Sequence, residues 1–140
     1  MNGSALEWSD NFSTDIMSID RQHQELLFLL QKLLDVLSRE DATLEDTQRV
    51  YQDLVDHALE HFDYEERIMK NIGYPDRKAH AAEHKDLRAQ IDAITQDVMH
   101  GDGKSDWKGL VSLVQVWLLR HIVSTDTKIR DFIQNGKADD

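Results

Sequence analysis

The stretch DRKAHAAEHKDLRAQIDAITQDVM, residues 76–99, shows most clearly that this chain is helical. Its apolar and imidazole side chains recur every three or four residues, which places them on one face of an α-helix. That face consists of His80, His84, Leu87, Ile91, Ile94 and Val98. A half-buried strand would alternate at every second residue, and strand signals of that kind are weak throughout the chain. The stretch predicts a helix whose buried face contains two histidines.

Three further segments repeat this spacing, at about residues 19–38, 44–71 and 106–134. A serine or threonine precedes each one, as expected of an N-cap residue: Ser18, Thr43 and Ser105. Four amphipathic helices of similar length joined by short loops predict an all-α fold, an up-down-up-down antiparallel four-helix bundle.

Glycine and proline mark where the predicted helices end. Gly73 and Pro75 close the second helix, the turn at 101–104 closes the third, and Gly136 closes the fourth. These limits divide the chain into an N-terminal arm at 1–17, a bundle at 18–136 and a frayed tail at 137–140. The arm carries three large apolar residues that are expected to pack over the end of the bundle: Trp8, Phe12 and Ile16.

The composition excludes several classes of partner and chemistry. With 16 basic and 27 acidic residues, the formal charge is −11, which disfavours nucleic acid and anionic membranes as partners. The chain has no cysteine, so disulfides, thiolate metal sites and thiolate catalysis are excluded. No secretory signal and no membrane span are visible, so a cytoplasmic location is expected.

Polar side chains with metal-binding chemistry interrupt the apolar faces of all four predicted helices. They are His23, His61, Glu65, His80, His84, His121 and Asp126. A single histidine on such a face is most often a hydrogen-bonded core residue. Burying five imidazoles and two carboxylates without partners, however, would cost several kcal/mol for each group. A shared metal site in the bundle core would satisfy all seven.

The number of candidate ligands indicates two metal ions. Five nitrogen donors and two carboxylates exceed what one tetrahedral or octahedral ion accepts. Two ions bridged by the two carboxylates would use the whole set. Imidazole-rich ligation without thiolate suits iron, and copper and zinc are also tolerated.

The spacing between His121 and Asp126 does not fit a regular α-helix. Five residues correspond to a rotation of about 140°, which would turn the two side chains away from each other. We therefore predict a local π-type turn between them, a device that often occurs at functional sites.

The complete set of seven residues resembles the signature of the hemerythrin family, in its single-domain bacterial form, the bacteriohemerythrins. The flanking sequences also match: Ile19-Asp20-x-Gln22-His23, His61-Phe62 with Glu65-Glu66, Gly73-Tyr74-Pro75, and Trp8 in the arm. The resemblance covers essentially the whole chain.

This resemblance implies a protein that binds dioxygen reversibly, for carriage, storage or delivery, rather than an enzyme. It implies two non-haem iron ions joined by an oxo or hydroxo bridge, with one iron on His80, His84 and His121 and the other on His23 and His61. The family's oxygen pocket corresponds to three residues of the fourth helix: Trp117, Leu118 and Ile122.

Other functions stay open at this point. The chain could be an oxygen or redox sensor that acts through a separate, unidentified protein partner. A di-iron oxidase or peroxidase is less favoured, because no glutamate is followed by histidine three residues later. A zinc hydrolase is also disfavoured, although 57–61 and 80–84 both read H-x-x-E-H, because Glu60 and Glu83 are expected on solvated faces. His57 is expected at the surface, and His100 at a helix C-terminus.

Overall fold

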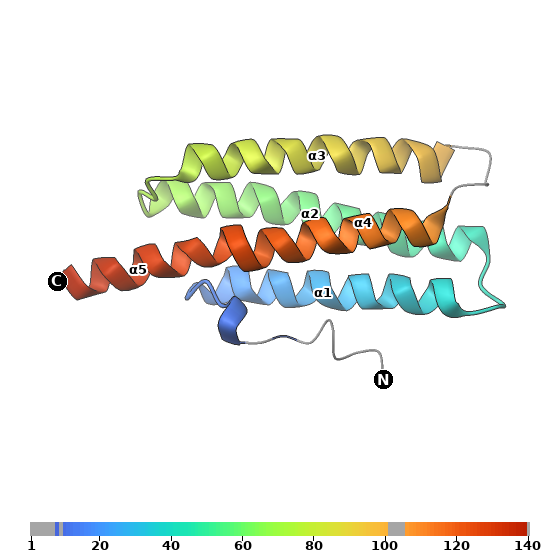
Figure 1. Ribbon diagram of the computed structural model, residues 1–140, viewed down its shortest axis with the longest axis horizontal. Coiled ribbons are helices and arrows are strands. Elements are labelled where there is room, and N and C mark those ends of the chain that lie inside the picture. The colour runs from blue at the N-terminus through green and yellow to red at the C-terminus, as the bar shows by residue number, and fades with distance from the viewer. Residues whose placement is uncertain (1–7, 9, 101–105, 140) are drawn as a thin grey trace.

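The computed structural model describes residues 8, 10–100 and 106–139, and this part of the chain contains helices and no strand (Figure 1). A short 3₁₀ turn, η2 (Asp10–Phe12), lies in the arm. The long helices are α1 (Met17–Ser38), α2 (Leu44–Asn71) and α3 (Arg77–His100). They are followed by α4 (Trp107–Arg120), η3 (His121–Asp126) and α5 (Thr127–Asp139), which continue one another without a break.

The helices form an antiparallel bundle, as predicted. Figure 1 shows α1 running in one direction, α2 returning, α3 running forward again, and the α4–η3–α5 column returning along the bundle. Helix α1 packs against α2 and α4, and α3 packs against the same two helices. This closed arrangement brings one face of every helix into a common core.

Both predicted ends of α2 are confirmed, and each has a capping motif. At the start, the Thr43 hydroxyl accepts from the Asp46 amide, and the Asp46 carboxylate accepts from the Thr43 amide. At the end, Gly73 adopts a positive φ of 70°. The Gly73 amide bonds to the Lys70 carbonyl and the Tyr74 amide to the Met69 carbonyl, which is a Schellman motif.

Helix α1 begins differently from the prediction. Ser18 is the second residue of the helix rather than its N-cap, and its hydroxyl accepts from Tyr64. The position before the helix is held by Ile16, which has no capping side chain. Asp20 instead reaches back to the arm and accepts from the Thr14 amide and the Ser13 hydroxyl. The first turn of α1 is therefore tied to the arm by a carboxylate inside the helix.

Four other predicted boundaries change. Helix α3 is displaced by one residue at each end, and Asp106, not Ser105, caps α4 by accepting from the Gly109 amide. Ser105 and the predicted turn at 101–104 lie outside the described residues. Gly136 does not end the last helix, which continues to Asp139. A glycine inside a helix costs only about 1 kcal/mol relative to alanine, so it need not stop one.

Of the three arm residues predicted to pack over the end of the bundle, Ile16 does so, against Met69, Tyr74 and Ile129, whereas Trp8 and Phe12 pack elsewhere. Asn11 accepts a hydrogen bond from Arg130, and Asp15 accepts one from Gln134, so the arm is joined to α5. The turn η2 also contacts η3. Trp8 packs edge-on against Phe12, and both lie against the main core.

The polar side chains of the core separate two apolar clusters. The larger cluster contains the buried leucines and valine of α1 between Leu26 and Val36, and the facing parts of α2, α3 and α4. The smaller cluster, at the opposite end, contains Met69, Tyr74 and Ile129. Within the described residues, no helix is both long enough and apolar enough to cross a lipid bilayer.

Candidate metal centre

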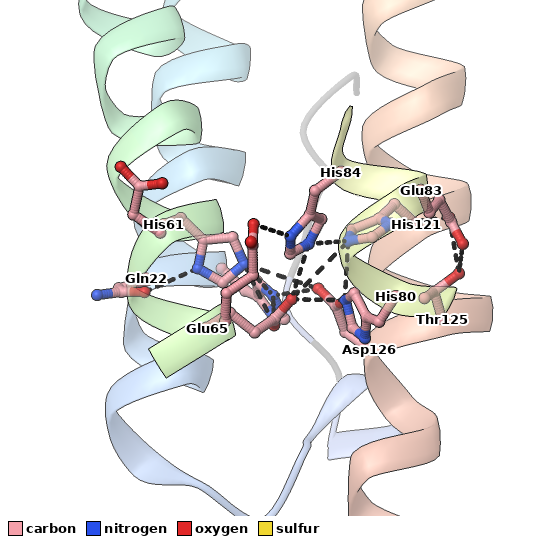
Figure 2. A network of polar contacts seen from close by, with 12 residues as sticks. Gln22, His61, Glu65, His80, Glu83, His84, His121, Thr125 and Asp126 are labelled. Carbon is pink, nitrogen blue, oxygen red and sulfur yellow. Dashed lines mark hydrogen bonds and ion pairs between the residues drawn. The ribbon is translucent and has the colours of Figure 1, made fainter. Parts of the chain in front are cut away.

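The structure brings all seven predicted ligand residues together in the bundle interior. Helix α1 supplies one of them, α2 and α3 supply two each, and η3 supplies the last two: His23; His61 and Glu65; His80 and His84; His121 and Asp126. None of these residues is more than 3 % exposed. Figure 2 shows side chains from separate helices pointing toward one another.

These side chains form two overlapping groups that could each hold a metal ion. One group contains Glu65, His80, His84, His121 and Asp126. The other contains His23, His61, Glu65 and Asp126. Within each group, the ligand atoms all lie within 4.8 Å of one another. The two carboxylates belong to both groups, and each histidine belongs to only one.

Each shared carboxylate directs one oxygen toward each group. Asp126 Oδ1 lies 2.8 Å from His80 Nε2 and 2.9 Å from His121 Nε2, whereas Oδ2 lies 2.7 Å from His23 Nε2. Glu65 Oε1 lies 2.7 Å from His80 Nε2, whereas Oε2 lies 3.4 Å from His61 Nε2. This is the arrangement that two bridging carboxylates require.

The predicted π turn is confirmed and explains how η3 supplies two ligands. The segment His121–Asp126 is π-helical, so its backbone bonds join residues five apart. Residues with this spacing lie above one another on the same side. His121 and Asp126 are therefore both buried and both face the centre, with 1 % and 0 % exposure.

Three of the imidazoles are oriented by hydrogen bonds from their Nδ1 atoms. His61 Nδ1 donates to the amide oxygen of Gln22 at 2.7 Å. His84 Nδ1 donates to Glu66 at 2.9 Å, and His121 Nδ1 donates to Glu83 at 2.8 Å. Because these oxygens can only accept, Nδ1 carries the proton and Nε2 faces the centre as a potential ligand.

The Nε2 atoms then meet in two close pairs. His84 Nε2 and His121 Nε2 lie 3.0 Å apart, and so do His23 Nε2 and His61 Nε2. When the rings are neutral, the His84 and His121 lone pairs face each other with no proton between them. The four oxygens of Glu65 and Asp126 are also buried without a hydrogen bond of good geometry. A donor set of this kind fits metal ions better than it fits an empty core.

Without metal, the same electrostatics would draw protons into the site. Burial alone would lower the pKa of His61 and His80, but close contacts with Asp126 and Glu65 raise both pKa values to about 9. Burial likewise opposes the charge of His121, yet Asp126, Glu65 and Glu83 raise its pKa to about 11. Despite burial, the facing histidines hold the pKa of Glu65 and of Asp126 well below the usual range.

The residues that orient the imidazoles were not assigned from the sequence. Glu83 was expected on a solvated face, but it is half-buried and contacts both His121 and Thr125. Glu60, the other glutamate of the H-x-x-E-H patterns, is exposed as expected. The sequence offered one signal, because Gln22 and Glu83 each stand next to a predicted ligand. Each of them, however, bonds to an imidazole of another helix.

His57 and His100 stand outside this cluster. His57 is exposed, as expected, and its ring bonds to the Asp53 carbonyl at 3.1 Å. His100 is the last residue of α3 and is also exposed, which agrees with the expected position at a helix C-terminus.

An apolar cavity of about 30 Å³ lies beside the cluster. Phe62, Trp117 and Leu118 are among its lining residues. Phe62 also stacks on the His84 ring, with a centroid separation of 4.4 Å. Ile122, the third predicted pocket residue, is buried in the same apolar core but does not line this cavity.

Comparisons with known proteins agree with this geometry. The family described as "Hemerythrin HHE cation binding domain" matches residues 14–133. A bacteriohemerythrin of Pseudomonas aeruginosa (strain LESB58) is 29 % identical over 136 residues, covering 96 % of this chain and 85 % of the relative.

Two further matches support the same family. A bacteriohemerythrin of Clostridium acetobutylicum is 24 % identical, covering 89 % of this chain and 98 % of the relative. A crystal structure of wild-type hemerythrin superimposes with a TM-score of 0.77 at 26 % identity, covering 86 % of this chain and 92 % of that one. The chain is therefore a member of the hemerythrin HHE cation-binding family.

Proposed function

We propose that this protein binds dioxygen reversibly at a centre of two non-haem iron ions. One observation carries the proposal. Glu65 and Asp126 each direct one oxygen toward the first group of histidines and the other oxygen toward the second group. Two carboxylates shared in this manner support a pair of metal ions rather than one. Imidazole-rich ligation without thiolate favours iron among the candidate metals.

The two ions would have different coordination. In this proposal one iron is held by His80, His84 and His121, and the other by His23 and His61, with both carboxylates shared. The first group offers five protein donors and the second offers four. The second iron would therefore have fewer protein ligands, and we place dioxygen binding there.

When bound, the iron pair would supply both the position for dioxygen and the electrons that hold it. The chain's own contribution is to orient the ligands and to exclude water. Hydrogen bonds from Nδ1 of three imidazoles keep their Nε2 atoms directed inward. Apolar residues around the adjacent cavity keep proton donors away, since small cavities with apolar walls stay dry.

The size of the cavity favours a diatomic ligand over an organic substrate. Pockets that bind small organic molecules usually measure about 300–1,000 Å³. The cavity beside this centre measures about 30 Å³. Oxygen binding without a second substrate thus agrees better with the geometry than oxidase or hydrolase chemistry does.

Anaerobic reconstitution with ferrous iron tests the proposal. We expect two irons per chain and a visible charge-transfer band that appears under dioxygen and disappears under argon. Binding of a single zinc ion, or iron that oxidises without a reversible band, would contradict it.

Two variants of α2 provide a matched control for the iron count. His57→Ala and His61→Ala remove imidazoles one turn apart on the same helix, one exposed and one 2 % exposed. His57→Ala should retain two irons, whereas His61→Ala should bind fewer. Equal iron content in the two variants would remove His61 from the ligand set.

A further inference from the structure

The π turn η3 is the irregular element on which the centre depends. In a regular α-helix, Thr125 would follow His121 at a spacing of four and share its inward face. Asp126 would then turn away from the centre. In the observed π turn Asp126 takes the inward position with 0 % exposure, and Thr125 is displaced toward α3, where it is half-buried.

The metal-free chain has a physical reason to avoid this π turn. π-helical turns are rare, and the inward position of Asp126 buries a carboxylate at a cost of several kcal/mol unless it is compensated. An α-helical register would bury the hydroxyl of Thr125 instead, which is cheaper. The facing histidines offset part of this cost once Asp126 lies inward, and a contact with the turn itself favours the π register further.

Glu83 of α3 supplies such an interaction at two points of the turn. Its Oε1 accepts from His121 Nδ1 at 2.8 Å and from the Thr125 hydroxyl at 2.8 Å. Its Oε2 lies 3.0 Å from the same hydroxyl. Figure 2 shows Glu83 and Thr125 directed toward each other on the outer side of the cluster. The two donors are the first and fifth residues of the six-residue turn, and Thr125 immediately precedes Asp126.

Glu66 provides an internal comparison. It accepts from His84 Nδ1 at 2.9 Å, just as Glu83 accepts from His121. It also lies 3.7 Å from Arg88 of α3, and among the described residues its polar contacts do not include η3. Glu66 contacts one imidazole, whereas Glu83 contacts an imidazole and also the residue next to Asp126.

We infer that Glu83 is a positioning residue that holds η3 in its π register through Thr125, so that His121 and Asp126 face the centre together before metal binds. This inference deepens the proposed function, because it concerns the assembly of the same centre. Its first readout uses the metal-free chain and does not depend on oxygen binding.

Substitutions at Thr125 test the inference without touching a proposed ligand. Thr125→Val keeps the shape of the side chain and removes the hydroxyl, and Thr125→Ser keeps the hydroxyl. For Thr125→Val we expect faster amide hydrogen exchange across residues 121–127 of the metal-free protein. We also expect about 10- to 100-fold weaker ferrous ion binding under anaerobic conditions, the usual effect of losing an interaction that orients ligands. Thr125→Ser should restore both properties.

Two controls separate positioning from a general loss of stability. Thr95→Val removes another hydroxyl that bonds across helices, to Tyr51 at 2.9 Å. It should leave exchange at 121–127 and ferrous ion binding unchanged. Glu66→Gln and Glu83→Gln both weaken a hydrogen bond to an imidazole, but only Glu83→Gln should accelerate exchange at 121–127.

Wild-type exchange and wild-type ferrous ion affinity in Thr125→Val would overturn the inference. So would equal acceleration at 121–127 in Glu66→Gln and Glu83→Gln. Neither result would bear on whether the wild-type centre binds dioxygen. Conversely, a wild-type chain without a reversible oxygen band would leave these exchange measurements valid.

Discussion

Leu118 is the residue at which the proposed oxygen pocket can be tested most directly. It lies one turn before His121 on α4, is 7 % exposed and lines the apolar cavity. We predict that Leu118→Ala admits water to the centre and accelerates autoxidation of the oxygenated protein, because water supplies the protons that the apolar wall excludes. Decay of the oxygenated spectrum in air measures this rate.

Leu113→Ala is the matched control for this change. Leu113 lies on the same helix but is 45 % exposed. We expect Leu118→Ala to lower the free energy of unfolding by about 2–5 kcal/mol. Leu113→Ala should change it by about 0.5 kcal/mol or less and leave autoxidation unaltered. An unchanged autoxidation rate in Leu118→Ala would remove this residue from the pocket.

At the scale of single residues, the seven candidate metal ligands could be predicted from the sequence. The residues that orient their imidazoles by hydrogen bonds could not. A histidine or carboxylate on an apolar face is conspicuous because it breaks the periodicity, as His84 does on α3. Gln22, Glu66 and Glu83 lie at the edges of the buried faces, where polar residues are ordinary. Their roles depend on the distance to another helix, which spacing along one helix does not reveal.

At the scale of elements, the end of α2 is defined by backbone conformation. Gly73 has a φ of 70°, and an added Cβ would meet no atom within 4 Å. Any cost of a side chain there is therefore conformational rather than steric crowding by neighbours. We predict that Gly73→Ala lowers the free energy of unfolding by about 1–2 kcal/mol, the penalty for an L-residue in the left-handed region. Urea unfolding of the metal-free protein measures this loss.

Gly73→Asn serves as the comparison, because asparagine accepts the left-handed conformation more readily than alanine. It should lose less stability than Gly73→Ala. If Gly73→Ala were as stable as the unchanged protein, the Schellman motif would not contribute to the end of α2. A similar loss in both variants would point to the turn between α2 and α3 rather than to φ.

Helix boundaries were predictable where local chemistry alone decides them. Thr43 acts through its hydroxyl and Gly73 through its backbone conformation, both on groups a few residues away, and both were predicted correctly. Ser18 was predicted wrongly, because contacts of the arm with Asp20 let α1 start two residues earlier, at Met17. The π turn was predicted for a different reason, since two ligands five residues apart cannot face one centre from an α-helix.

At the scale of the whole molecule, the arm and the bundle contribute to one interior. The packing of Trp8 and Phe12 against the main core could not be predicted, because spaced apolar residues in an arm do not indicate which groove they fill. The hydrogen bonds that join the arm to α5 come from Arg130 and Gln134, which lie more than a hundred residues away in sequence. The bundle itself was predictable because four buried faces of similar length leave few other ways to pack.

The buried charges make the stability of the metal-free protein depend on pH. The pKa of His61 and His80 rises from 6.5 to about 9, and that of His121 to about 11. Raised histidine pKa values contribute stability that is fully present below pH 6.5 and is lost as pH rises through about 9 to 11. The lowered pKa values of Glu65 and Asp126 contribute stability that is lost as pH falls below their ordinary values of 4.5 and 3.8.

We therefore predict that the metal-free protein is most stable between about pH 5 and pH 6.5, and that its urea midpoint is lower at about pH 9 than at about pH 6.

Bound metal should prevent this loss of stability at high pH. Metal ligation requires neutral imidazoles, so the metal takes the place of the protons that the histidines otherwise carry. The iron-loaded protein should thus keep its midpoint at about pH 9 and lose it in acid, where protons displace the metal. His57→Ala should leave both profiles unchanged, since His57 lies outside the cluster. A metal-free protein that was more stable at about pH 9 than at about pH 6 would show that these histidines are neutral in the folded chain, and that the carboxylates do not hold protons on them.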